Sequence, residues 1–219
     1  MVLRRPTSPK RAESALSLVV PCTFTSDAAL VTGVIEGDPG AIETLYDRHA
    51  SYVTRVLARI LGAEPEIAEL EHEVFLRALN SIERLKDPSS IRAWLAGIAV
   101  FTAKTCIQRR RRGAWLRFFS FDEVPEVEAT TASDEVGEAV RATYAILDSL
   151  PADERIAFAL RVIDGMDLTE IAAACDASIS TVKRRIARAE RRFLAMAREQ
   201  PALVDWVEGG ARWGANVDR

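Results

Sequence analysis

The sequence predicts an all-α protein made of two small helical domains joined by a flexible acidic linker. Apolar residues recur at helical spacing along most of the chain, and signals for β-strands are almost absent. The 219 residues suffice for one large or two small domains. The helical pattern lapses once, over residues 113–137, where acidic, glycine and proline residues gather. We therefore expect a disordered N-terminal extension at 1–25, domains at 26–112 and 138–199, and a C-terminal tail at 200–219.

Local start and stop signals set the helices of the first domain. Ser26 has the side chain of an N-cap, and Gly62 marks the end of a helix. The Asp-Pro pair in the turn at 37–40 favours a new helix start. A second loop is expected at 86–90. The sequence thus predicts helices at about 26–36, 41–61, 65–80 and 90–112.

The second domain contains the clearest local pattern of the chain. Residues 167–174 form a short helix rich in small alanines, and residues 175–177 form a turn. A second helix starts at Ser178 or Ser180 and runs past Phe193. This spacing is typical of a helix-turn-helix, in which the second helix enters the major groove of DNA.

At about 100° per residue, the apolar residues of the second helix fall on one face and its basic residues fall on the opposite face. Its candidate DNA contacts are Ser180, Thr181, Lys183, Arg184, Arg185, Arg188 and Arg191. In this motif the start of the helix reaches base edges, so Arg184 can pair with guanine, whereas Arg188 and Arg191 lie nearer to phosphates. The alternative is an ordinary arginine-rich surface helix, which would not explain why turn, small-residue helix and basic face coincide.

The composition argues against several other classes of protein. Three scattered cysteines and two histidines provide neither a disulfide framework, nor metal-ligand spacing, nor a Ser-His-Asp triad. We therefore expect no cofactor, no metal, no small-molecule substrate and no enzymatic activity. The run at 16–20 is shorter than a signal core, and no apolar run reaches the ~20 residues that span a bilayer. The expectation is a cytoplasmic protein without membrane insertion.

These motifs resemble the ECF group of the bacterial sigma-70 family. The pieces that follow the family's fourth domain, which binds the minus-thirty-five promoter element, lie at 150–155, 160–166, 170–172 and 180–189. The pieces that follow its second domain lie at 37–41, 45–46, 69–78, 91–95, 98–99 and 109–112. The resemblance implies sigma domain 2 at 26–112 and helix-turn-helix sigma domain 4 at 138–199.

The resemblance also implies a surface that binds core polymerase. The helix at 65–80 has an apolar inward stripe and an outward face formed by Glu69, His72, Glu73 and Leu76. In the family this face docks on the clamp helices of the largest polymerase subunit. An acidic rim around an exposed leucine suits a basic helical partner. The family usually has glutamine at the position of His72, and an ordinary solvated acidic face is the alternative interpretation.

The loop at 85–90 and the next helix lie where the family melts the minus-ten element and traps a flipped-out base. Phe101 stands where the family often has asparagine, and it can stack on a base or pack in the core. The arginine run is expected to hold phosphates, or else to be a solvated helix end. The candidate contacts are Lys86, Ser89, Ser90, Phe101, Lys104, Arg109, Arg110, Arg111 and Arg112.

The resemblance implies a sigma factor that binds core RNA polymerase, directs it to specific promoters and assists promoter melting. The expected partners are core RNA polymerase, promoter DNA and an anti-sigma factor, which most of this group have. The alternative function is a free-standing helix-turn-helix transcriptional regulator, which would have no need of the N-terminal half. A nuclease would need convergent carboxylates or histidines, whereas the acids here lie on the linker and on one helix face.

Overall fold

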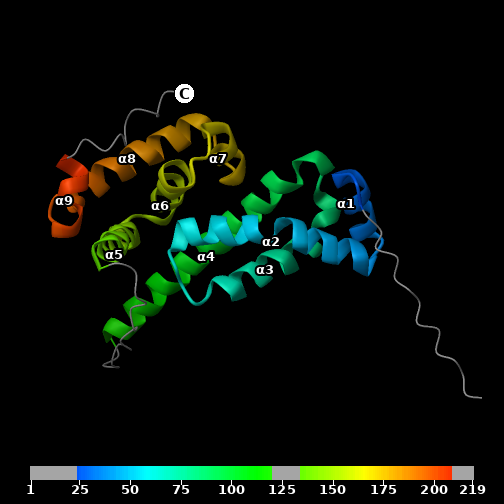
Figure 1. Cartoon of the computed structure of the whole chain (residues 1–219), viewed down its shortest axis with the longest axis horizontal. Coiled ribbons are helices and arrows are strands. Elements are labelled where there is room, and N and C mark those ends of the chain that lie inside the picture. Colours follow the sequence, from blue (N-terminus) through cyan, green and yellow to red (C-terminus); the bar gives the residue numbers. More distant parts are fainter. Residues whose placement is uncertain (1–23, 120–133, 209–219) are drawn as a thin grey trace, which may run out of the picture.

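The computed structural model describes residues 24–119 and 134–208, and these residues form helices without strands (Figure 1). The first three helices are α1 (Asp27–Ile35), α2 (Pro39–Leu61) and α3 (Ile67–Leu79). The Ser26 side chain caps α1 by accepting from the Ala29 N–H, which confirms the predicted start. Asp38 caps α2 in the same way, and Gly62, with φ of 92°, ends it.

Helix α4 (Ile91–Phe119) is the centre of the fold. Two 3-10 turns, η1 (Ile82–Arg84) and η2 (Pro88–Ser90), lead into it, and it packs against α2 and α3 on one side. Within residues 88–113, an 18-residue window is long and apolar enough to cross a membrane by length and composition alone. Half of this window is buried inside the protein, as expected for a core helix.

The C-terminal half contains the helix-turn-helix. Its helices are α5 (Asp134–Ser149), α6 (Ala152–Phe158), the π-helical segment η3 (Ala159–Asp164), α7 (Leu168–Ala174), α8 (Ile179–Ala197) and α9 (Pro201–Glu208). Gly165, with φ of 84°, ends η3 in the left-handed conformation that glycine tolerates. Asp167 and Glu170 form a capping box at the start of α7.

Three boundaries differ from the sequence prediction. Helix α4 continues through 113–119, and α5 begins at Asp134, so both ends of the predicted linker are helical. Part of the predicted C-terminal tail forms α9, because Leu203 is buried against α5 and α8. The extension at 1–23, the centre of the linker at 120–133 and the end of the tail at 209–219 lie outside the described residues.

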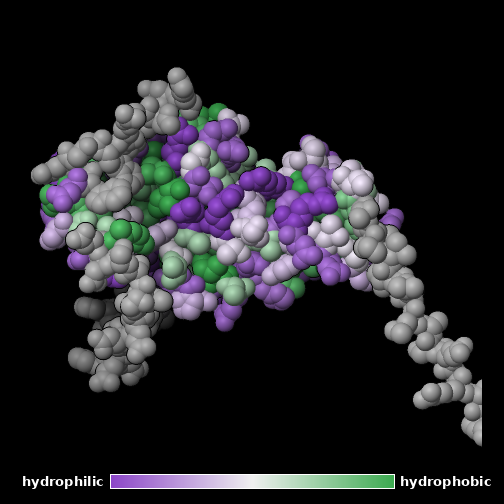
Figure 2. Space-filling model, viewed as in Figure 1, coloured by the Kyte–Doolittle hydropathy of each residue, from purple (hydrophilic) through white to green (hydrophobic). Residues whose placement is uncertain are grey.

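The two halves pack directly against each other. Helices α6 and α7 contact α4, and η3 contacts α2. The main hydrophobic core is therefore shared: it contains Leu95 and Ala99 of α4 as well as Ile156, Ile171 and Val182 of the C-terminal half. A second, smaller core lies among α5, α6, α8 and α9. In Figure 2 the largest hydrophobic patch visible lies over the helices of the C-terminal half.

Candidate nucleic-acid and polymerase interfaces

Helix α8, the second helix of the helix-turn-helix, has a buried apolar face and an exposed basic face. Ser178 caps it by accepting from the Thr181 N–H at 3.2 Å. The predicted apolar stripe packs inward, with Val182, Ile186, Ala189 and Phe193 buried. The exposed side chains include Ser180, Lys183, Arg184, Arg188 and Arg191. These five predicted DNA contacts thus share a solvent-facing surface.

The other two predicted contacts on α8 are engaged inside the protein. The Thr181 hydroxyl lies 3.0 Å from the Ser178 hydroxyl. Arg185 is partly buried and forms an ion pair of 3.3 Å with Asp153 of α6. Arg185 therefore helps to hold α8 on α6, and it reaches DNA only if this pair opens.

The turn before α8 contains a residue with positive φ and a partly buried cysteine. Asp176 has φ of 46°, a left-handed conformation that aspartate tolerates better than most residues. The neighbouring Cys175 is partly covered, and burial raises the pKa of its thiol to about 11. A thiol with this pKa is protonated near neutral pH, so the turn carries no reactive nucleophile.

Helix α3 presents the predicted polymerase-binding face to solvent. Glu69, His72 and Leu76 are exposed, and Leu76 keeps 48% of its surface. On the opposite side, Leu70, Val74 and Ala78 are buried as the sequence predicts. An exposed leucine with polar neighbours can provide the apolar centre of a small protein contact.

Glu73, the fourth predicted residue of the α3 face, is linked through Arg77 to Phe101, a predicted minus-ten contact on α4. Glu73 binds Arg77 of the same helix at 2.5 Å, and the Arg77 guanidinium lies 5.1 Å from the ring centre of Phe101 on α4. Phe101 is 56% exposed, which excludes the core interpretation of this residue. Arg77 was missed from the sequence, although it lies one helical turn after Glu73 on α3.

A pocket opens beside Phe101, between α4 and α7. Trp94 and Phe101 supply its aromatic side, Arg77 supplies a cation, and Ala173 and Asp176 close it from the helix-turn-helix. Lys104, one turn after Phe101, forms an ion pair of 2.7 Å with Asp153. Asp153 therefore contacts predicted DNA-binding residues of both halves, Lys104 and Arg185, and no local signal in the sequence indicates this.

Two of the three predicted DNA contacts in the loop before α4 form hydrogen bonds within the loop itself. Lys86 is exposed. The Ser89 hydroxyl donates to the Asp87 carboxylate at 2.7 Å, and the Ser90 hydroxyl donates to the Asp87 carbonyl oxygen at 2.7 Å. Both hydroxyls stabilise η2, and a hydrogen bond to a DNA base would have to replace these bonds.

The four consecutive arginines have different environments. Arg110 pairs with Glu64 at 3.3 Å and with Glu66 at 3.1 Å, and its hydrogen bond lowers the pKa of the Glu66 carboxyl. Arg111 donates to the backbone carbonyls of Asp148 and Leu150 in the other half. Arg109, Arg111 and Arg112 are exposed, and only Arg110 is partly buried. Arg109 and Arg112 are therefore the members of the run that are exposed and have no hydrogen bond to the other half among the described contacts.

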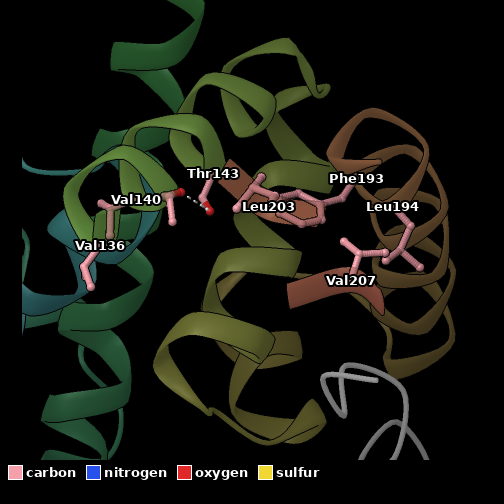
Figure 3. A pocket seen from close by; sticks show the side chains of 8 residues that line it. Val136, Val140, Thr143, Phe193, Leu194, Leu203 and Val207 are labelled. Carbon is pink, nitrogen blue, oxygen red and sulfur yellow. Dashed lines mark hydrogen bonds between the residues drawn. The ribbon is translucent and has the colours of Figure 1, made fainter. Parts of the chain in front are cut away.

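Two further observations concern a pocket and metal binding. A mostly apolar pocket lies among α5, α8 and α9, lined by residues that include Val140, Thr143, Phe193 and Val207 (Figure 3). Within 24–119 and 134–208, no group of three or more His, Cys, Asp or Glu side chains is arranged to hold a metal ion.

Family models match both halves of the chain. The model described as sigma-70 region 2 matches residues 45–115, and the model described as sigma-70, region 4 matches residues 141–193. The first match contains the α3 face and most of α4, and the second contains α6, α7 and most of α8.

Similar proteins and structures agree with these matches. The ECF RNA polymerase sigma-E factor of Escherichia coli (strain K12) is 29% identical over 173 residues, covering 75% of this chain and 90% of that protein. The protein of the same name from Haemophilus influenzae is also 29% identical, covering 75% and 91%.

Two solved structures share the fold. CnrH in complex with the cytosolic domain of CnrY has a TM-score of 0.55 and 22% identity, covering 79% of this chain and 97% of that one. The sigma factor RpoE in complex with the anti-sigma factor NepR from Bartonella quintana has a TM-score of 0.52 and 20% identity, covering 71% and 96%. With both halves matched in order, the chain belongs to the sigma-70 family of RNA polymerase sigma factors, in its ECF group.

Proposed function

We propose that this sigma factor binds core polymerase through α3, reads the minus-thirty-five element with α8 and engages the minus-ten element with α4. The observation that carries the proposal is the presence, in one chain, of an exposed basic recognition helix and a separate acidic-apolar helix face. A free-standing regulator would account for α8 but not for the exposed Leu76 with its acidic neighbours.

The minus-thirty-five element would be read from the start of α8. Ser180, Lys183 and Arg184 are exposed in its first two turns, where a helix that enters the major groove end-on reaches base edges. Arg188 and Arg191 follow one and two turns later and would neutralise phosphates along the groove wall. Base contacts at the helix start supply specificity, and the later arginines supply affinity that depends on salt.

The minus-ten element would be held beside Phe101. A flipped base loses stacking, at a cost of a few kcal/mol, and an exposed aromatic ring can restore part of it. Phe101 offers such a ring, and Arg77 places a cation beside it for the neighbouring phosphate. Lys86 is exposed in the loop before α4 and can add a further phosphate contact.

The chain itself would perform no covalent step, because the polymerase carries out RNA synthesis. Its place of action is the cytoplasm, together with core RNA polymerase and promoter DNA. An anti-sigma factor is a further expected partner, since the sigma factor RpoE of the solved complex is bound by one, NepR.

A pull-down with purified core polymerase tests this proposal. The wild-type chain should be retained by core polymerase, and the holoenzyme should select promoter DNA from a random library. Arg141→Ala, on the exposed side of α5, serves as the surface control. Binding of DNA by the free chain without any retention by core polymerase would contradict the proposal and favour the free-standing regulator.

A further inference from the structure

A cavity of about 710 Å³ opens where the two halves of the chain meet. The last turns of α2 and the segment after them form one wall, and α5 and η3 of the C-terminal half form the other. Small-molecule sites have volumes of roughly 300–1,000 Å³, lie preferentially at domain interfaces, and combine apolar walls with a few polar groups. This cavity has the size and the location of such a site.

Most of the cavity wall is apolar. Val162 and Ile163 of η3 are partly buried, and Val140 of α5 is 49% exposed. Ala58 and Ala63 add methyl groups from the opposite side. A ligand with an apolar body would remove these side chains from water, which is favourable.

The hydroxyl groups in the wall already donate to the protein. The Tyr144 hydroxyl donates to the Ala58 carbonyl oxygen at 3.1 Å, and the Thr143 hydroxyl donates to the Ala139 carbonyl oxygen at 2.8 Å. Each hydroxyl has a single proton to donate. A ligand that needs a strong donor would therefore find it in the arginines of the wall.

Two arginines of α2 line the cavity, four residues apart and so on one face of the helix. Arg55 is matched by the Asp164 carboxylate, 3.3 Å away. Within 24–119 and 134–208, the exposed side chain of Arg59 has no ion-pair or hydrogen-bond partner. Burial raises the pKa of Tyr144, and the positive charges of Arg59 and Arg155 oppose this rise. The cavity thus has one uncompensated positive charge, that of Arg59.

This wall selects the chemistry of its ligand. A carboxylate accepts hydrogen bonds and donates none, and it matches the two parallel N–H groups of a guanidinium. An inorganic anion would bind Arg59 but leave the apolar wall uncovered. A hydrocarbon would cover that wall but gain nothing from Arg59. Both parts of the wall are used only by a molecule with one negative charge and an apolar body.

We propose that this cavity is a binding site for a small aliphatic monocarboxylate, with the carboxylate on Arg59 and the chain along Val140, Val162 and Ile163. The site goes beyond the proposed function and does not depend on it, because its lining residues are not among the proposed DNA or polymerase contacts. The bound molecule would contact both halves of the chain at once.

A nuclear magnetic resonance titration of the full-length chain with decanoate tests the proposal. The backbone amide signals of Ala58, Ala63 and Val162 should shift and saturate, with a Kd of about 1 mM or tighter. Acetate has the same head without the chain, and decyltrimethylammonium has the same chain with the opposite charge. Each should bind at least about tenfold more weakly than decanoate does.

Two variants locate the ligand. Arg59→Gln removes the charge and should weaken decanoate binding at least about tenfold, because a hydrogen bond to a charged group is lost. Val140→Ser shortens the apolar wall and should weaken binding at least about threefold. Both side chains are exposed, so both variants should fold, and the dispersion of the amide signals shows whether they do.

Matched controls lie on the same helix, α5. Arg141→Gln removes an exposed arginine outside the cavity. Val136→Ser changes a valine one turn before Val140, which lines the neighbouring pocket but not this cavity (Figure 3). Neither control should change the affinity for decanoate.

Three outcomes would overturn the proposal. The first is the absence of saturable shifts at the cavity amides with decanoate. The second is an unchanged affinity in Arg59→Gln. The third is a loss of binding in Val136→Ser, which would place the chain in the neighbouring pocket. The titration uses neither core polymerase nor DNA, so failure of this site and failure of the proposed function remain distinguishable.

Discussion

Replacement of two arginines on one helix separates base reading from phosphate binding. Arg184 and Arg188 are both exposed on α8, one turn apart, or roughly 6 Å along the helix axis. Arg184 lies near the start of α8, where base edges are reached, and Arg188 lies nearer to the groove wall. We predict that Arg184→Ala changes which minus-thirty-five sequence is preferred, whereas Arg188→Ala weakens binding to all sequences alike.

The magnitudes follow from the two kinds of contact. Loss of a base-edge contact costs about 1–3 kcal/mol, or about 5- to 150-fold in affinity for the preferred sequence. Loss of one phosphate contact reduces the slope of log affinity against log salt by about 0.9. Neither change should affect folding, because both side chains are exposed and the buried stripe of α8 is untouched.

The assay is a selection of promoter variants by the holoenzyme, repeated at two salt concentrations. Arg141→Ala on α5 is the matched control, because it removes an exposed arginine of the same half away from α8. An altered sequence preference in Arg188→Ala, with none in Arg184→Ala, would show that the placement of α8 in the groove is wrong. If neither variant affected promoter binding, the assignment of α8 as the reading helix would fall.

Four further predictions concern the other surfaces and the core. Leu76→Arg should weaken retention by core polymerase without lowering the melting temperature, since Leu76 is 48% exposed; unchanged affinity would remove the α3 face from the proposal. Phe101→Ala should slow open-complex formation, measured by permanganate footprinting, while Phe101→Tyr should retain the stacking surface; equal rates in both would argue against stacking. Phe193→Ala should lower the free energy of unfolding by about 3–5 kcal/mol in a denaturant titration, because the ring is buried and stacks on Phe158 with centroids 5.0 Å apart; a loss below 1 kcal/mol would contradict its core role. Burial raises the pKa of the Glu190 carboxyl, so the protonated carboxyl contributes stability below the unfolded pKa, and this contribution is lost as the pH rises through the folded pKa. Glu190→Gln should flatten the decline of the melting temperature with rising pH, and a pH profile identical to that of the wild type would refute this prediction.

Much of the local structure could be predicted from the sequence because its causes are local. Caps such as Ser26 and the stop at Gly62 act within one turn of a helix, and the apolar stripe of α8 follows from the helical period. The exposed faces of α3 and α8 emerged for the same reason, since an amphipathic helix fixes which side is buried before its partner is known. The helix-turn-helix and its basic face were therefore predicted with their residues.

Only the tertiary structure decided which long side chains face solvent and which serve the fold. Arg111 and Lys104 are equally basic in the sequence, yet both are bound by the C-terminal half, because α4 passes beneath α6. Arg155 reads as a surface arginine but is buried at the end of α2. Such pairings join residues far apart in the chain, and no periodicity or capping rule specifies which helix ends meet. The sequence by itself determined the helices and their faces; the packing of the C-terminal half on α4 decided that Lys104 is paired with Asp153 whereas Phe101 stays exposed.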